Sequence, residues 1–215
     1  MKAVIIGGTG ATGRELLELL LADNTIKEIV ALVRKPLIIK HTKLKAVVVD
    51  FDKLGQWATY INGDVAFSCM GTTLKAAGSK AAQYKVDYTY QYAFAKIAQA
   101  NKIPVFLLVS SSSANSRSFV FYSAMKGQLE DAVAALGFDS LTILRPGPLV
   151  RPDTDRTGEK IGVGVMRFLS AFGILKNMQP IPVKRLAVLL LRYACYPKTG
   201  ITVLEAGQIL KEIKP

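Results

Sequence analysis

The chain has very little of the residues from which metal centres and disulfide frameworks are built. Among its 215 residues there is one histidine, His41, and there are two cysteines, Cys69 and Cys195, far apart in the sequence. These counts exclude a histidine-rich metal site, a CxxC zinc ribbon and a redox dithiol, and we expect no bound metal. Two unclustered cysteines fit a reducing, cytoplasmic environment. A Ser-His-Asp hydrolase would have to use His41, and no G-x-S-x-G elbow supports that chemistry.

Long hydrophobic runs are also missing. The apolar N-terminal stretch stops at Gly7-Gly8, and the longest later one, residues 186–191, is broken by Arg192. A signal peptide needs roughly 7–15 apolar residues in its middle region, and a membrane span needs about 20. We therefore expect a soluble cytoplasmic protein without a membrane partner.

Acidic residues are outnumbered by basic ones. Lys plus Arg total 28 and Asp plus Glu total 16, which gives a net charge of +12. The excess is spread evenly along the chain, whereas nucleic-acid proteins more often gather it into an arm or a stripe. We expect no nucleic-acid partner; an anionic small ligand or simple solubility explains the charge at least as well.

What the chain does contain is an alternation of short apolar runs and helical patterns. We expect strands at 3–6, 29–33, 46–49, 65–68, 105–109, 141–144 and 201–204. Helices are expected at 12–22, 54–61, 79–100, 121–136, 166–172 and 183–194. Continuous apolar strands indicate burial on both faces, hence a parallel sheet between helices. The prediction is an α/β, doubly wound parallel sheet in one domain, 1–215, to which residues 148–215 contribute a small substrate lobe.

A glycine-rich turn directly follows the first expected strand. The segment Gly7-Gly-Thr-Gly10-Ala-Thr-Gly13 satisfies both G-x-G-x-x-G and G-x-x-G-x-x-G. One glycine permits the tight turn, another lets the backbone approach a diphosphate, and Gly13 lets the helix pack close to the strand. The helix N-terminus then faces negative charge. We expect dinucleotide contacts from Gly7, Thr9, Gly10, Ala11, Thr12 and Gly13, in a Rossmann-type fold.

The end of the second expected strand indicates which dinucleotide is bound. NAD sites place a carboxylate there to hold the ribose hydroxyls. This chain has Arg34-Lys35 instead, and a guanidinium binds a 2′-phosphate with paired, charge-assisted hydrogen bonds. The sequence therefore predicts NADP(H). Asp50-Phe51 ends the third expected strand, where the carboxylate could accept from the adenine amino group or could be an ordinary loop acid.

Two Tyr-x-x-x-Lys pairs put a phenol and an ammonium group on one helix face. Tyr92 and Lys96 lie deep in the long helix, in a tyrosine stripe typical of packing. Tyr122 and Lys126 open the helix that follows the fifth strand and a serine run, where loops face the ligand crevice. A nearby positive charge lowers the pKa of a phenol, so we expect Tyr122 to become a better proton donor or acceptor. Ser110 and Ser111 could hold a carbonyl oxygen.

The glycine turn, Val109-Ser110-Ser111 and Tyr122-x-x-x-Lys126 resemble the short-chain dehydrogenase/reductase superfamily. The finer pattern resembles its atypical branch, the Tat-interacting-protein oxidoreductase-like proteins, through Arg14, residues 67–73, Val86-Asp87-Tyr88 and Arg145-Pro146-Gly147. The resemblance covers most of residues 1–150.

This resemblance implies roles for particular residues. Ser111 would orient the carbonyl, Tyr122 would donate the proton, and Lys126 would hold the nicotinamide ribose and tune Tyr122. The interval from Ser111 to Tyr122 is short for the family, so the other serines of the run 110–113 are rivals for the serine role. Asp87 occupies the position of a supporting Asn. Further cofactor contacts would come from Cys69, Met70, Gly71, Ser110 and Pro146.

Two functions follow as expectations. The first is an NADPH-dependent reductase acting on a carbonyl of a small, lipophilic substrate. The second is an NADP(H)-binding regulatory or protein-interaction module with little catalysis, because few residues are left for a substrate lobe. A homodimer or a protein partner is compatible with either. Residues from about 151 to 182 would line the substrate pocket. Within them Met166, Phe168, Leu169 and Phe172 suggest a lipophilic substrate, but the same residues suit a helix packed on the sheet.

Overall fold

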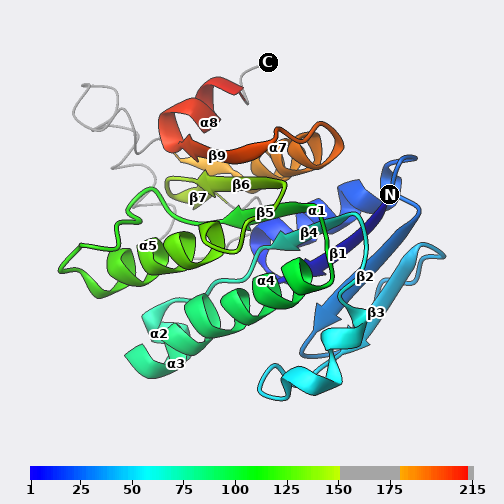
Figure 1. Cartoon of the computed structure of the whole chain (residues 1–215), viewed down its shortest axis with the longest axis horizontal. Helices are drawn as coiled ribbons and strands as arrows, with labels where there is room; N and C mark the ends of the chain where they lie inside the picture. The colour runs from blue at the N-terminus through cyan, green and yellow to red at the C-terminus, as the bar shows by residue number, and fades with distance from the viewer. Residues whose placement is uncertain (151–179, 213–215) are drawn as a thin grey trace.

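A parallel sheet runs through the centre of the computed structural model, which describes residues 1–150 and 180–212. Its seven strands lie in the order β3-β2-β1-β4-β5-β6-β9 (Figure 1). They are β1 (Lys2–Ile6), β2 (Glu28–Val33), β3 (Leu44–Val48), β4 (Val65–Ser68), β5 (Val105–Val109), β6 (Ser140–Arg145) and β9 (Gly200–Glu205). The order reverses between β1 and β4, which is where a doubly wound sheet forms its ligand crevice. The predicted fold class is confirmed.

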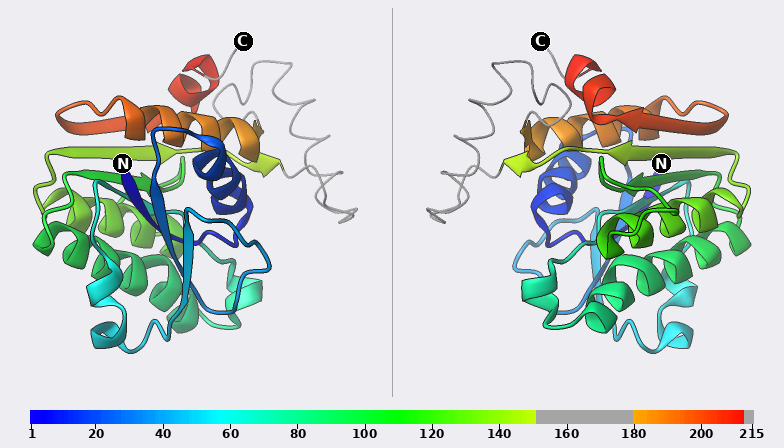
Figure 2. Two further views of the ribbon diagram at one scale, coloured as in Figure 1. Left: turned by 90° about the vertical axis from the view of Figure 1, so that its right-hand side faces the viewer. Right: turned by 90° about the vertical axis from the view of Figure 1, so that its left-hand side faces the viewer.

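Helices cover both faces of this sheet (Figure 2). Helices α1 (Ala11–Ala22) and α7 (Val183–Cys195) pack on one face, and α4 (Tyr90–Ala100) and α5 (Phe121–Ala134) pack on the other. Alternate residues of β1 serve the two cores: Ala3 and Ile5 face α1, whereas Val4 and Ile6 face α4. Burial on both sides is what the continuous apolar strands predicted. Strand β3 differs, because it lies at the sheet edge and is largely exposed.

The long helix expected over 79–100 is one continuous helical segment with an irregular centre. The Ser79 hydroxyl accepts the Ala82 N–H at 3.1 Å and begins α3 (Lys80–Tyr84). A π-helical turn, η3 (Lys85–Thr89), then leads into α4. The fully buried amide of Gln91 donates to the Asp87 carbonyl at 3.0 Å, and its own oxygen accepts from Ser68 on β4 at 2.8 Å. One buried side chain thus fixes the π-turn to the sheet.

Some elements were not expected. Two short 3₁₀ turns, η1 (Leu54–Gln56) and η2 (Ala58–Tyr60), replace the single helix predicted there, and a four-residue helix α2 (Leu74–Ala77) follows β4. A two-stranded pair, β7 (Leu149–Val150) with β8 (Ile181–Pro182), and the helix α8 (Ala206–Glu212) also went unpredicted. The expected helix 166–172 lies outside the described residues. Of the expected lobe 148–215, α7 and β9 join the central sheet and its core.

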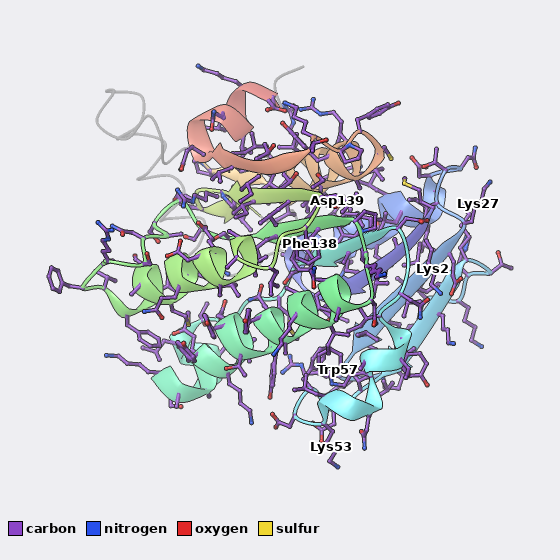
Figure 3. The ribbon with its side chains drawn as sticks, viewed as in Figure 1. Lys2, Lys27, Lys53, Trp57, Phe138 and Asp139 are labelled. Carbon is purple, nitrogen blue, oxygen red and sulfur yellow. The ribbon has the colours of Figure 1, made fainter. Side chains whose placement is uncertain are left out.

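Trp57 anchors the connection from β3 to β4 (Figure 3). Its side chain is fully buried, and its ring lies 5.4 Å from that of Phe51. Phe51 is thereby held at the carboxyl end of β3.

Candidate functional site

The turn after β1 is one that only glycine can form. Gly7 has a φ of +77°, and a Cβ on it would lie 2.4 Å from the Cys69 carbonyl carbon. A Cβ on Gly13 would lie 2.1 Å from the Gly7 oxygen, and the Gly10 N–H donates to that oxygen at 2.9 Å. Gly8 has no comparably close neighbour. The spacing that the backbone uses is therefore G-x-x-G-x-x-G.

An open cleft lies beside this turn, with a volume of about 660 Å³ that is partly open to solvent. It is formed by the carboxyl ends of β1, β2, β3 and β4 and by the helical segment after β4. The residues that line it are Gly7, Thr9, Gly10, Leu32, Val33, Arg34, Phe51, Cys69, Met70, Gly71, Val86 and Tyr90. Eight of the residues predicted from sequence to contact the cofactor are among them.

Helix α1 begins at the edge of the same cleft. Its N-cap is Gly10, which offers no side-chain cap, and its first turn carries no acidic residue. Ala11, Thr12 and Gly13 form that turn, so its backbone N–H groups are left for an external acceptor. The tight turn needs glycine at positions 7 and 13, and the first turn of α1 has no side-chain cap. Together they leave free backbone N–H groups, which fit a diphosphate.

The end of β2 carries positive charge without a carboxylate. Arg34 lines the cleft and is exposed, and Lys35 is exposed beside it. Asp50 is also exposed, and its carboxylate accepts the Asp52 N–H at 3.0 Å and pairs with Lys53 at 3.6 Å. The carboxylate thus already serves as a turn acceptor, as an ordinary loop acid would.

Sequence reasoning missed four residues of the cleft wall: Leu32 and Val33 at the end of β2, and Val86 and Tyr90 on the helical segment after β4. The Tyr90 ring lies 5.5 Å from that of Phe51, and its hydroxyl donates to Asp52 at 2.7 Å. Lys85 also binds Asp52, at 2.7 Å. No sequence pattern singles out Tyr90, because the π-turn changes which side of the helix faces the cleft.

Ser111, Tyr122 and Lys126 lie together where β5 ends and α5 begins. Ser111 lies close enough to the phenol of Tyr122 to lower the pKa of that phenol. Lys126 is one turn further along α5 and is 2% exposed. Its ammonium group donates to the Val109 carbonyl at 3.4 Å and lies 3.9 Å from the Asp87 carboxylate.

Asp87 connects this cluster to the cleft. It is 1% exposed, and its carboxylate accepts the Thr72 N–H at 3.0 Å. A Cβ on Gly71 would lie 3.6 Å from the same carboxylate, and Gly71 lines the cleft. Asp87 therefore links the two groups of predicted residues, although Ser111, Tyr122 and Lys126 are not among the residues that line the cleft.

The electrostatics of this cluster correct one expectation. The pKa of Tyr122 is raised, first by burial and then by the Asp87 charge, although the nearby Ser111 hydroxyl opposes the rise. Burial also raises the pKa of Asp87 and lowers that of Lys126. The expected lowering is therefore not found, because burial and the Asp87 charge outweigh it. Tyr122 accordingly keeps its proton at neutral pH.

The serine run has one member that is engaged elsewhere. Ser110 is buried, and its hydroxyl donates to Glu130. Glu130 in turn binds Arg145, whose guanidinium also reaches Glu205 at 2.6 Å. The Ser111 hydroxyl lies 3.1 Å from that of Ser113, which is exposed. The geometry therefore favours Ser111 over Ser110 as the serine that faces a substrate.

Three further residues singled out in the sequence have contacts or surroundings that the structure describes. The Pro146 carbonyl accepts the Ser112 N–H at 3.0 Å, which ties the serine run to the end of β6. Desolvation raises the pKa of the Cys69 thiol to about 12, so the thiol keeps its proton although the residue lines the cleft. Tyr92 joins a row of rings, 5.9 Å from Tyr88, as the packing interpretation of the tyrosine stripe predicts.

Comparison with known proteins places these features in a family context. A family described as NAD(P)H-binding matches residues 7–169. The chain is 32% identical to the mitochondrial protein FMP52 of Candida albicans over 87% of this chain and 86% of that one. It is 35% identical to the protein HTATIP2 of Rattus norvegicus over 68% of this chain and 62% of that one.

Solved structures with the same fold have far lower identity. The Bordetella bronchiseptica enzyme WbmH in complex with NAD⁺ has a TM-score of 0.74 at 14% identity and covers 99% of this chain and 79% of its own. A short-chain dehydrogenase family protein from Francisella tularensis has a TM-score of 0.66 at 16% identity, with coverage of 97% and 98%. These likenesses show the fold alone.

The same comparisons bear on location. The FMP52 relatives carry the word mitochondrial in their names. Within residues 1–150 and 180–212, no helix has both the length and the apolar character needed to cross a bilayer.

Proposed function

Because the chain belongs to the NAD(P)H-binding family, in the atypical short-chain dehydrogenase/reductase branch that HTATIP2 represents, we propose that it is an NADP(H)-dependent reductase of small carbonyl compounds. The observation that carries this proposal is the buried pair of Lys126 and Asp87, which lies beside Tyr122 and is connected through Gly71 to the cleft at the glycine turn.

The preference for the phosphorylated cofactor rests on Arg34. Its guanidinium is exposed on the cleft rim, and residues 29–49 contain no Asp or Glu that would repel a 2′-phosphate or hold a 2′-hydroxyl. Gly7, Gly10, Gly13 and the first turn of α1 would hold the diphosphate. Phe51 and Met70 would provide apolar walls.

In the proposed reaction the bound cofactor supplies the hydride, and this chain supplies the proton and the alignment. The Ser111 hydroxyl binds the substrate oxygen and places it against Tyr122. Tyr122 donates its proton to that oxygen as the carbonyl carbon is reduced, which gives the alcohol. A raised phenol pKa suits this donor role, because the proton is present at neutral pH. The phenolate is then reprotonated from solvent along Ser111 and the exposed Ser113.

A second candidate is the cofactor-binding module without turnover. One observation favours it: burial and the Asp87 charge raise the pKa of Tyr122, so the phenol is less acidic than a free one. The two candidates share the cofactor and differ only in the chemistry that follows.

The test is NADPH oxidation by the purified protein with a panel of aldehydes and ketones, together with Tyr122→Phe. We expect turnover that this variant abolishes while NADPH affinity is kept. Tyr92→Phe, in the second Tyr-x-x-x-Lys pair, is the matched control and should keep full turnover. Equal turnover in wild type and Tyr122→Phe would refute the assignment, and NADPH binding without oxidation across the panel would select the module.

Compartment and partners complete the proposal. The scarcity of cysteine predicts the cytoplasm, and the names of the FMP52 relatives supply the competing prediction, the mitochondrion. Cell fractionation of the native protein decides between them.

A homodimer is the simplest assembly to expect, and sedimentation velocity tests it.

A further inference from the structure

Exposed apolar side chains gather in the segments that leave the carboxyl ends of the parallel strands. Ile38 and Ile39 follow β2, Leu74 follows β4, and Phe119 and Val120 follow β5. Ile38 is 97% exposed and Phe119 is fully exposed. Because carboxyl ends of parallel strands lie at one edge of a sheet, these side chains share the edge where the cleft opens.

Contacts join these segments into one surface. Arg34 and Gly71 line the same cleft, which brings the segments after β2 and β4 together. The Lys80 ammonium group lies 5.6 Å from the centre of the Phe121 ring, which brings together the segments after β4 and β5. Helices α2 and α3 and the start of α5 accordingly lie on one side of the molecule (Figure 1). We name residues 34–40, 69–80 and 110–121 the carboxyl-edge face.

The three segments of this face carry positive charge and no acid, and the exposed acids that follow β3, Asp50 and Asp52, are paired with Lys53 and Lys85. The stretch 29–49 contains no Asp or Glu, and Asp87, which is buried, is the one acid in the sequence between Asp64 and Glu130. Exposed cations are present in all three segments of the face: Arg34, Lys35, Lys40, Lys75, Lys80 and Arg117. A surface of this kind is complementary to anions.

We propose that the carboxyl-edge face docks on an anionic lipid bilayer. Projecting apolar side chains insert at the boundary between headgroups and acyl chains, while surrounding cations contact lipid phosphates and carboxylates. Four of the five exposed apolar residues are aliphatic, and aliphatic side chains neither stack on bases nor read base edges, so a lipid surface fits better than a nucleic acid. The expectation of no membrane partner rested on the lack of a spanning segment, which does not bear on surface docking.

Docking in this orientation directs the cleft toward the lipid. A lipophilic carbonyl compound dissolved in the bilayer would then reach Tyr122 without crossing water. This consequence for the substrate rests on the proposed function, whereas the docking itself does not.

The experiment is co-sedimentation of the whole protein with vesicles of phosphatidylcholine, with and without phosphatidylserine. We expect binding to the anionic vesicles alone, weakened by salt. Each of the double variants Ile38→Ser/Ile39→Ser and Phe119→Ser/Val120→Ser should lose about tenfold or more in partitioning, from lost apolar insertion. Lys40→Ala and Lys75→Ala should each lose about fivefold.

Val188→Ser/Ile201→Ser provides the matched control, because these residues are about half exposed but lie on α7 and β9, outside the face. It should partition like wild type, and circular dichroism checks that every variant is folded. The proposal is overturned if anionic vesicles do not bind the protein, or if the face variants and the control behave alike. It is equally overturned if the face variants dissolve a dimer or abolish DNA binding while leaving vesicle binding intact. None of these readouts requires turnover, so failure of the reductase proposal would be seen separately.

Discussion

The carboxylate of Asp87 and the ammonium group of Lys126 lie 3.9 Å apart with almost no solvent exposure on either side chain. Burial opposes the charge on each group, and the attraction between them favours it. The pair lies beside Tyr122, and it therefore affects both the stability of the fold and the acidity of that phenol.

Asp87→Asn should move the pH dependence of carbonyl reduction. Tyr122 donates a proton, so kcat falls as pH rises through its pKa. The Asp87 charge raises that pKa, and its removal lowers the pKa and exposes the phenol to the uncompensated Lys126 charge. The alkaline loss of kcat should therefore begin at lower pH in the variant. An alkaline limb that stays in place or moves upward would contradict this.

The same substitution should destabilise the protein. It leaves Lys126 buried without its partner, which costs about 3–5 kcal/mol in comparable buried pairs. Urea unfolding at neutral pH measures the loss. Asp87→Asn/Lys126→Met removes both charges and should recover most of the stability; a double variant as unstable as the single one would mean that the pair is not the cause.

Substitution of Ser110 should mainly lower the stability of the fold, whereas substitution of Ser111 should mainly lower kcat. Ser110→Ala removes a donor to the buried Glu130 and should lower stability by about 1–3 kcal/mol, with a smaller effect on kcat. Ser111→Ala removes the hydroxyl that faces Tyr122 and should lower kcat about 100-fold with little change in stability. Steady-state kinetics and urea unfolding of both variants provide the comparison, and the reverse pattern would reassign the serine role.

Arg34→Ala should weaken NADPH binding by about 10- to 100-fold, the value of one or two charge-assisted hydrogen bonds. NADH, which has no 2′-phosphate, should bind the variant and the wild type alike. Titration of cofactor fluorescence measures both affinities. Lys96→Ala is the control for a general loss of positive charge; if it weakened NADPH binding equally, Arg34 would have no specific role.

Gly13→Ala should disrupt the glycine turn. The added Cβ would lie 2.1 Å from the Gly7 oxygen, so α1 must move away from β1, at a cost of about 1–3 kcal/mol or more. NADPH affinity should fall together with stability. Gly55→Ala is the matched control, because a Cβ there meets nothing within 4 Å. Its midpoint of thermal unfolding should equal that of the wild type or lie slightly above it.

Most of the fold could be predicted from the sequence because its signals are local. Apolar runs of four to six residues, one glycine turn and a serine helix cap are each contained in a short segment, and burial on both faces follows from the runs themselves. The edge position of β3 could not be predicted, since strand order is set by long-range pairing. Helix α8 and the β7–β8 pair were missed because short elements carry weak periodicity.

The candidate site divides in the same way. The glycine turn and Arg34 could be predicted because each contact needs a specific residue type at a specific spacing. Tyr90 could not, because a helix that contains a π-turn no longer follows the 3.6-residue period. The raised pKa of Tyr122 was missed for a different reason: Asp87 comes from another helix and faces Lys126 only in the folded chain.

The π-turn at Lys85–Thr89 gives the site a particular evolutionary vulnerability. Such a turn holds one residue more than an ordinary helical turn, and here Gln91 binds the carbonyl that the irregularity frees. Loss of a single codon in this stretch would restore a regular helix and rotate Asp87 away from Lys126, while every strand stayed in register. A descendant could therefore give up its proton chemistry in one genetic step and retain both its fold and its nucleotide cleft.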